Sequence, residues 1–244
     1  MSETPWLSVV VPFRDEAPSL VALHGELRAA LDPLGRAIEL LFVDDASRDE
    51  GPAILETLAA GDPRIRLLRL TPHSGQSAAL EAGFRAARGE VVATLDADGQ
   101  NDPADLPRLL AALDEADCVC GVRVDRQDPR STRIASRVAN AVRGRVLGDG
   151  LRDIGCALRV MRAAPLARIR LFRGGHRFLP SMLRMEGARV VELPVAHRPR
   201  RHGTSRYGIA SRLAVVWIDL LGMVWWARRV QRYEVKESVR RVDE

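Results

Sequence analysis

Cysteine is scarce in this chain, with only three among 244 residues. Cys118 and Cys120 lie two positions apart in an apolar run, and no second pair is spaced to complete a zinc site with them. Cys156 leaves an odd number, which excludes a fully disulfide-paired scaffold. We therefore expect reduced thiols that pack in the core.

Several other signals are absent. The sequence has no HExxH, GxSxG, Walker A or GxGxxG motif, which excludes the usual signatures of zinc proteases, α/β-hydrolases, P-loop nucleotidases and dinucleotide-binding enzymes. The polar first six residues run directly into an apolar segment, so no targeting peptide is expected. The last hydrophobic stretch, 213–227, is interrupted by Asp219 and is shorter than the roughly 20 residues that a membrane span needs.

Charge is unevenly distributed along the chain. Residues 1–120 carry 10 arginines and 21 acids, whereas residues 121–212 carry 21 arginines and 6 acids. Only one lysine, Lys236, is present, and the whole chain has a net charge of +5. An acidic half followed by a basic half suggests a metal-holding region beside a surface for phosphates or anionic lipid. The arginines lack interleaved aromatic residues, so no nucleic-acid partner is expected.

Apolar periodicity predicts an α/β fold. Strand-like runs are expected at 7–11, 38–43, 65–70, 91–95 and 117–122. Helices are expected between them at 19–31, 51–60, 77–87 and 104–113. The second half is less regular, with helices at 132–147 and 176–185 and strands at 156–161 and 189–195. This alternation predicts a mostly parallel sheet covered by helices on both faces, and we treat both halves as one domain.

Acidic residues follow three of the predicted strands. The run 91–95 leads into Asp96 and Asp98, with Gln100 just beyond. Side chains at i and i+2 of an extended segment point the same way, so these groups are expected to offer oxygens to one divalent cation. The strands at 7–11 and 38–43 lead into further acids, namely Asp15, Glu16, Asp44, Asp45 and Asp49. Since gathered like charges repel, a cation or the hydroxyl groups of a sugar are expected at this edge of the sheet.

Five ordered segments carry a resemblance to a known family: PFRDE at 12–16, VDDASRD at 43–49, LDADGQ at 95–100, DIGC at 153–156 and RRHGTSRY at 200–207. The first three resemble family 2 glycosyltransferases of the GT-A type. The last two look like the dolichyl- or polyprenyl-phosphate mannosyltransferases, and the resemblance covers roughly residues 5–230. It implies a GT-A fold and an inverting enzyme that moves mannose from GDP-mannose onto a polyprenyl phosphate, assisted by Mg²⁺ or Mn²⁺.

The resemblance also implies roles for individual residues. It assigns Asp98 and Gln100 to the metal and places Asp96 near the ribose, the diphosphate and the same ion. The nucleotide sugar would contact the following further residues: Pro12, Glu16, Val43, Asp45 and Ala97. Asp44 and Asp49 are expected to shape loops. Where relatives commonly show an aromatic or basic residue and then Asn, this chain has Arg14 and Asp15. Guanine and uracil therefore both remain open as the base.

Arginines are the expected anion ligands. Guanidinium groups match phosphate oxygens bidentately, and the resemblance implies a clamp on the diphosphate and the acceptor phosphate, formed by Arg123, Arg200, Arg201 and Arg206. A solvated basic loop is the alternative. Asp153 is expected to orient a sugar hydroxyl or the acceptor without acting as a base. A phosphomonoester is already largely ionised near neutral pH, so its oxygen can attack without deprotonation.

Three segments are expected: a GT-A domain over 5–208, an amphipathic C-terminal helix over 209–231, and a polar tail over 232–244. Tryptophans and flanking arginines favour a helix lying in an anionic membrane interface, while packing on the domain or in a homodimer is the alternative. We expect a cytoplasmic protein held peripherally at the inner face of the membrane. Two other functions stay open: a UDP-sugar-dependent family 2 enzyme with another lipid or glycan acceptor, and an inactive nucleotide-sugar-binding protein.

Overall fold

The structure is a computed structural model that describes residues 4–124, 130–199 and 209–229. In the two helices that begin at residues 130 and 209, side chains are described from residues 137 and 217 onward.

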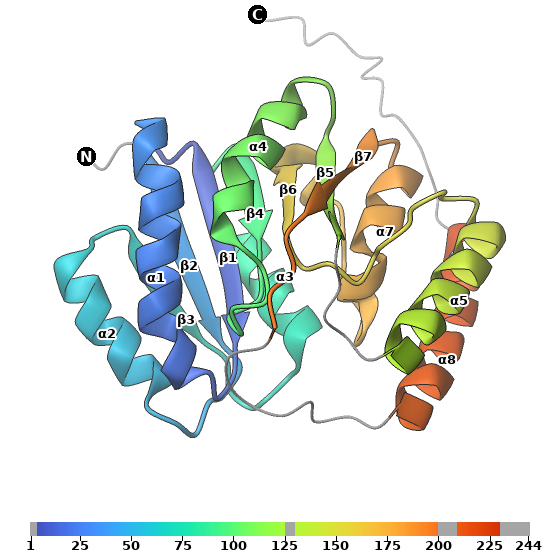
Figure 1. Cartoon of the computed structure of the whole chain (residues 1–244), viewed down its shortest axis with the longest axis horizontal. Coiled ribbons are helices and arrows are strands. Elements are labelled where there is room, and N and C mark those ends of the chain that lie inside the picture. Colours follow the sequence, from blue (N-terminus) through green and yellow to red (C-terminus); the bar gives the residue numbers. More distant parts are fainter. Residues whose placement is uncertain (1–3, 125–129, 200–208, 230–244) are drawn as a thin grey trace, which may run out of the picture.

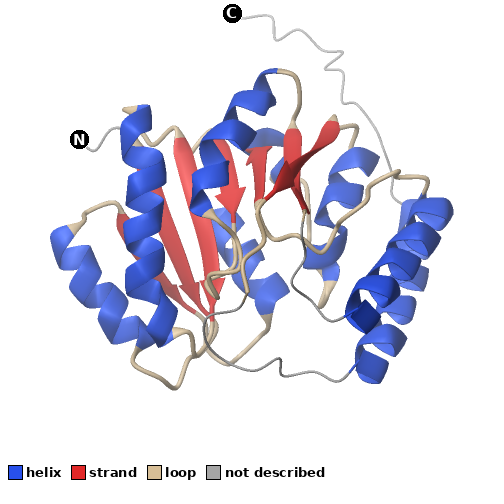
Figure 2. Cartoon of the chain, viewed as in Figure 1, coloured by secondary structure: helices blue, strands red, loops and turns tan. Residues whose placement is uncertain are grey.

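One seven-stranded sheet runs through the molecule in the order β3-β2-β1-β4-β6-β5-β7 (Figures 1 and 2). Its strands are β1 (Leu7–Phe13), β2 (Ile38–Asp44), β3 (Ile65–Arg69), β4 (Val91–Thr94), β5 (Cys118–Arg123), β6 (Arg159–Arg162) and β7 (Val190–Val195). β6 is antiparallel to both of its neighbours, and all the other neighbouring pairs are parallel. The prediction of a mostly parallel sheet is confirmed.

Helices cover both faces of this sheet (Figure 1). They are α1 (Ala17–Leu31), α2 (Gly51–Gly61), α3 (Gln76–Ala86), α4 (Leu106–Ala111), α5 (Arg130–Leu147), α6 (Ala163–Leu166), α7 (Leu179–Met185) and α8 (Ile209–Ala227). Alternate residues of β1 point to opposite faces, as a pleated strand requires. Val9 and Val11 join the core under α1, α2 and α4, whereas Val10 joins the core under α3, α7 and α8.

The predicted elements occur with shifted bounds, and two of the predicted helices are interrupted by 3₁₀ turns. The helix expected at 104–113 is the short α4 between the 3₁₀ turns Pro103–Asp105 and Ala112–Asp114. The helix expected at 176–185 is a 3₁₀ turn, Gly175–Phe178, followed by α7. Prolines in the first turns of α4 and α7 explain both breaks, because proline lacks the N–H that a continuous helix would use.

All three cysteines are buried and unpaired, as predicted. Burial raises the pKa of the Cys156 thiol to about 12, which keeps it protonated and unreactive.

The carboxyl ends of the parallel strands meet at one edge of the sheet, where α/β folds bind their ligands. β1, β2, β4 and β5 all deliver their following loops to this edge. Because β6 runs the opposite way, the segment before it, which contains Asp153, also arrives there. The carboxyl edge is therefore the place to look for a functional site.

Candidate functional site

Asp96 and Asp98 lie in a loop just beyond β4. The strand ends at Thr94, residues 97 and 98 form a turn, and Gly99 has φ of +74°. The prediction that these acids share one face of an extended segment is therefore wrong. The Asp98 carboxylate accepts a hydrogen bond from the Gln100 backbone N–H at 3.1 Å, which closes the turn and brings the three predicted metal ligands into a compact loop.

A residue that the sequence did not reveal contacts Asp96. The Gln76 side-chain amide donates to the Asp96 carboxylate at 2.7 Å. The backbone N–H of Asp96 points to the side-chain oxygen of Asn101 at 3.5 Å, and Asn101 is buried. Gln76 is the first residue of α3, which follows β3 at the same edge, and this position was the only signal that could have identified it.

Asp45 is buried and held by the loop before α3. Its carboxylate accepts hydrogen bonds from the backbone N–H groups of Ser74 at 2.7 Å and Gly75 at 2.8 Å. The His73 imidazole lies 2.7 Å from the same carboxylate. A carboxylate offers about four acceptor sites. Three protein donors therefore fix its orientation and leave little of its capacity for a ligand.

Asp44 and Asp49 shape loops, as expected. The Asp44 carboxylate accepts the Ser47 N–H at 2.8 Å. The Asp49 carboxylate accepts the N–H groups of Ala17 at 2.8 Å and Gly51 at 3.0 Å, so it holds the starts of two helices together. These bonds satisfy N–H groups that helix starts leave without a partner.

The unusual Arg14 and Asp15 also have a structural role. Asp15 has φ of +53°, and its carboxylate accepts the Arg48 N–H at 2.7 Å, while its own N–H donates to the Ser47 hydroxyl at 3.0 Å. Arg14 lies 3.7 Å from the Asp15 carboxylate. The loops after β1 and β2 are thus locked together.

The remaining predicted nucleotide contacts lie around this edge. Pro12 and Val43 are buried within β1 and β2, and Ala97 is buried in the turn after β4. Glu16 is half-buried at the start of α1, where its carbonyl accepts the Ser19 hydroxyl at 2.9 Å. Pro12 and Val43 lie near the carboxyl ends of their strands, and Glu16 and Ala97 lie in the segments that follow β1 and β4, so all four are at the same edge of the sheet as Asp45 and Asp96.

Arg123 and Asp153 form a bidentate ion pair. The Arg123 Nε and Nη2 atoms each lie 2.8 Å from a carboxylate oxygen of Asp153, and the Arg123 backbone N–H adds a third contact at 3.2 Å. The N–H groups of Arg152 and Asp153 in turn donate to Glu192 at 2.8 and 3.1 Å. The first task of the Asp153 carboxylate is therefore to orient the Arg123 guanidinium.

Arg200, Arg201 and Arg206 lie outside the described residues. Within the described ranges, no group of three or more His, Cys, Asp or Glu side chains gathers around a metal position. Asp96, Asp98 and Gln100 offer only oxygen ligands, which suits a hard cation such as Mg²⁺ or Mn²⁺ when a bound diphosphate completes the coordination.

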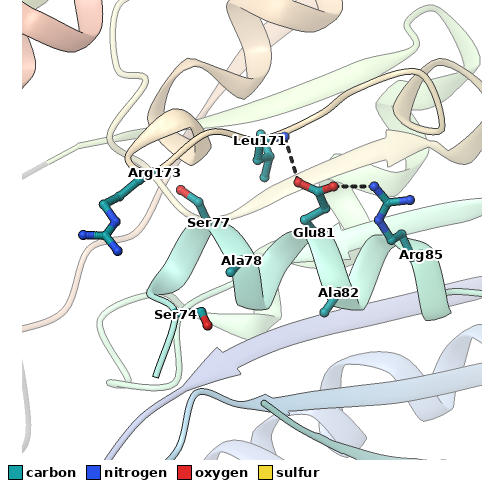
Figure 3. Close-up of a pocket in the computed structure, with 8 residues that line it drawn as sticks. All are labelled: Ser74, Ser77, Ala78, Glu81, Ala82, Arg85, Leu171 and Arg173. Carbon is teal, nitrogen blue, oxygen red and sulfur yellow. Dashed lines mark hydrogen bonds and ion pairs between the residues drawn. The ribbon is translucent and has the colours of Figure 1, made fainter. Parts of the chain in front are cut away.

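A surface groove of about 320 Å³ lies between α3 and residues 171–173 (Figure 3). It is lined by Ser74, Ser77, Ala78, Glu81, Ala82, Arg85, Leu171 and Arg173. None of these residues was predicted for the site. The groove begins at Ser74, beside the loop that holds Asp45, and follows the outer side of α3 away from the carboxyl edge.

Comparison with known proteins gives consistent matches. The family model described as glycosyl transferase family 2 matches residues 8–170. Dodecaprenyl-phosphate galacturonate synthase of Rhizobium johnstonii is 36% identical over 228 residues, which cover 91% of this chain and 67% of that protein. Undecaprenyl-phosphate 4-deoxy-4-formamido-L-arabinose transferase of Edwardsiella ictaluri is 36% identical over 214 residues, which cover 87% and 66%. The chain spans about two thirds of the length of these relatives.

Solved structures share the fold at lower identity. Mannosyltransferase PcManGT from Pyrobaculum calidifontis, solved with GDP-Man and Mn²⁺, has a TM-score of 0.68 and 22% identity, and the match covers 96% of this chain and 67% of that one. Glucosyl-3-phosphoglycerate synthase from Mycobacterium tuberculosis has a TM-score of 0.66 and 16% identity, with coverage of 93% and 81%. Identities this low show a common architecture only.

Proposed function

Because the chain belongs to glycosyltransferase family 2 and has its GT-A fold, we propose that it transfers a sugar from a nucleotide donor to a polyprenyl phosphate. The observation that carries this proposal is the gathering of Asp45, Asp96 and Asp98 at the carboxyl edge of the sheet. The names of the relatives, each a transferase or synthase acting on a polyprenyl phosphate, support the acceptor.

The identity of the donor sugar is a separate part of the proposal. The resemblance of the motifs favoured mannose from GDP-mannose, whereas the relatives are named for galacturonate and 4-deoxy-4-formamido-L-arabinose. We therefore propose three candidates for the donor sugar: mannose, galacturonate and 4-deoxy-4-formamido-L-arabinose. Arg14 and Asp15 hold each other and the next loop, so they give no preference between guanine and uracil.

In the proposed reaction, an oxygen of the ionised acceptor phosphate attacks the anomeric carbon, and the nucleoside diphosphate leaves from the opposite side. This geometry inverts the configuration. The acceptor needs no general base, because a phosphomonoester carries its negative charge near neutral pH. The Arg123 guanidinium, oriented by Asp153, would hold acceptor or donor phosphate oxygens, together with Arg201 and Arg206.

A divalent cation fits the residues present. Asp98, Gln100 and Asp96 would hold it with their oxygens, and the ion would supply neutralising charge to the departing diphosphate. Solved neighbours that contain Mn²⁺ or Mg²⁺ with a nucleotide support the use of such an ion in this fold.

The acceptor requires access to a membrane, and α8 offers a surface for it. Leu220 and Met223 are buried against the core, whereas the opposite side of the helix exposes four large apolar side chains, with exposed fractions of 47% for Trp217, 69% for Ile218, 68% for Leu221 and 62% for Trp225. Large apolar side chains exposed together on one side of a helix are typical of an interaction surface.

We favour an anionic membrane surface at the cytoplasmic face as the partner of this side of α8. Arg228 and Arg229 are exposed at its end, and the Arg229 guanidinium lies 5.8 Å from the centre of the Trp225 ring. Among the described residues, no helix is both long and apolar enough to cross a bilayer. A homodimer formed through the same surface is the alternative, and gel filtration coupled to light scattering separates the two.

The decisive experiment is a donor screen on the purified chain. GDP-mannose, UDP-galacturonate and UDP-4-deoxy-4-formamido-L-arabinose would each be incubated with a short polyprenyl phosphate, with Mn²⁺ and with EDTA. Transfer with one donor, abolished by EDTA and restored by Mn²⁺, is expected. Binding of nucleotide sugars without any transfer would favour the inactive binding protein. In a parallel incubation with a glycan acceptor, transfer to the glycan alone would show that the acceptor is not a polyprenyl phosphate.

A further inference from the structure

Residues 74–77, which lead into α3 and form its first two positions, contact two acids at the carboxyl edge and the loop at residues 174–176. The backbone N–H groups of Ser74 and Gly75 hold the Asp45 carboxylate at 2.7 and 2.8 Å. The Gln76 amide reaches the Asp96 carboxylate at 2.7 Å. The Ser77 hydroxyl binds the loop at residues 174–176 through Gly174 and His176. Two acids that come from different strands are therefore oriented by one short segment.

The position of this segment is fixed by the packing of α3. The Ser77 hydroxyl lies 2.8 Å from Nδ1 of His176 and accepts the Gly174 N–H at 3.1 Å. One turn further, Glu81 accepts the Leu171 N–H at 2.9 Å (Figure 3). On the sheet side, a Cβ at Gly83 would lie 2.3 Å from the Val10 side chain, so helix and strand are in direct contact. The start of α3 is therefore held in place by contacts with the loop at residues 174–176 and with the sheet, while Gln76 itself is exposed.

We propose that Gln76 is a positioning residue that orients the Asp96 carboxylate toward the nucleotide and its cation, a role that rests on the proposed function. An ionised carboxylate only accepts hydrogen bonds, so the amide must present its NH₂ group to Asp96. A neutral donor fixes the carboxylate and leaves its full charge for the cation. An arginine or lysine at this position would instead neutralise part of that charge.

The test compares Gln76→Ala and Gln76→Glu with the wild-type protein. Arg85→Gln, at the far end of α3, is the matched control. Calorimetry would measure the affinity for UDP and for GDP with and without Mn²⁺, and kinetics would give kcat and KM for donor and acceptor. Gln76→Ala should weaken Mn²⁺-dependent nucleotide binding and kcat by about tenfold or more, since a hydrogen bond to a charged group is lost. The acceptor KM and the melting temperature should stay unchanged.

Gln76→Glu gives a pH signature that a purely structural role would not produce. The new carboxylate repels Asp96 at neutral pH, so the loss should exceed that of the alanine variant. On acidification its protonated form can donate a hydrogen bond, and the deficit relative to wild type should shrink. Wild-type Mn²⁺-dependent binding in Gln76→Ala, or a Gln76→Glu deficit that does not change with pH, would overturn the proposal.

These readouts also separate the two proposals. If the wild-type chain transfers no sugar to polyprenyl phosphate while its Mn²⁺-dependent nucleotide affinity still falls in Gln76→Ala, the acceptor assignment fails and the role of Gln76 stands. If transfer occurs and the variant behaves as wild type in both assays, the role of Gln76 fails and the enzyme assignment stands.

Discussion

The Arg123–Asp153 pair makes a quantitative prediction, because its two partners are almost enclosed. The side chain of Asp153 is 7% exposed and that of Arg123 is 16% exposed. Asp153→Asn keeps the shape of the side chain but removes its charge and turns one acceptor into a donor that faces the guanidinium. The loop itself stays attached, because the Asp153 N–H still donates to Glu192.

The expected cost follows from the contacts that are lost. A hydrogen bond to a charged group is worth about 1.5–3 kcal/mol, and breaking a buried ion pair costs about 3–5 kcal/mol. Arg123 keeps some access to solvent, which screens the interaction and lowers the cost. We therefore expect Asp153→Asn to reduce the free energy of unfolding by about 2–3 kcal/mol.

Urea denaturation of a double-mutant cycle measures this pair directly. The cycle consists of wild type, Asp153→Asn, Arg123→Gln and the double variant, and its coupling energy should be about 2 kcal/mol. Asp114→Asn, at an exposed acid, is the control and should change stability by less than about 0.5 kcal/mol. A coupling energy below about 0.5 kcal/mol would refute the ion pair. A much larger loss of transfer in Asp153→Asn than in Arg123→Gln would show that Asp153 acts on the substrate itself.

Three further outcomes are expected. Asp98→Ala should stay folded but lose about 100-fold or more in transfer, because the diphosphate is no longer neutralised; full activity of this variant after removal of metal would contradict the assigned role. Burial lowers the pKa of His176 to about 3. The His176 imidazole therefore stays neutral in the folded protein, whereas in the unfolded protein it gains a proton below about pH 6.5. Urea denaturation at pH 7 and pH 5 should therefore show up to about 2 kcal/mol more acid destabilisation in wild type than in His176→Asn, and equal pH dependence would refute the burial. The double variant Leu221→Gln/Trp225→Ser should co-sediment less with anionic vesicles than wild type does. Vesicle binding equal to that of wild type, at an equal melting temperature, would exclude α8 as the lipid-contacting surface.

The sequence alone predicted the architecture of the first half because burial is periodic there. Leucines at helical spacing and short continuous apolar runs indicate which residues face the core, and the buried residues of α1 and β1 follow that pattern. The motifs PFRDE, VDDASRD and LDADGQ also placed the acids at the carboxyl edge, since the end of each strand could be located from the end of its apolar run.

Local patterns were less informative where proline or glycine intervenes and at the C-terminal helix. Proline in the first turn of α4 and of α7 separates each helix from the 3₁₀ turn before it, a break that hydrophobicity alone does not predict. The extended geometry assumed for Asp96 and Asp98 failed because Gly99 adopts positive φ and closes a turn. For the C-terminal helix, the sequence left membrane, core and dimer open. The structure shows one side of α8 in the core and the other exposed, so a single helix meets two environments.

The partners of the site residues were decided only by the tertiary structure. Gln76 and Asp96 are 20 residues apart, and Arg123 and Asp153 are 30 apart. No local signal links either pair. Each contact depends on the order of the strands, in which β4 lies beside β1 and the antiparallel β6 is inserted between β4 and β5. A one-dimensional pattern records whether each residue prefers water or the core, whereas strand order is fixed by the packing of all the elements together. Sequence could therefore say which residues gather at the edge, and only the fold could say which of them hold one another.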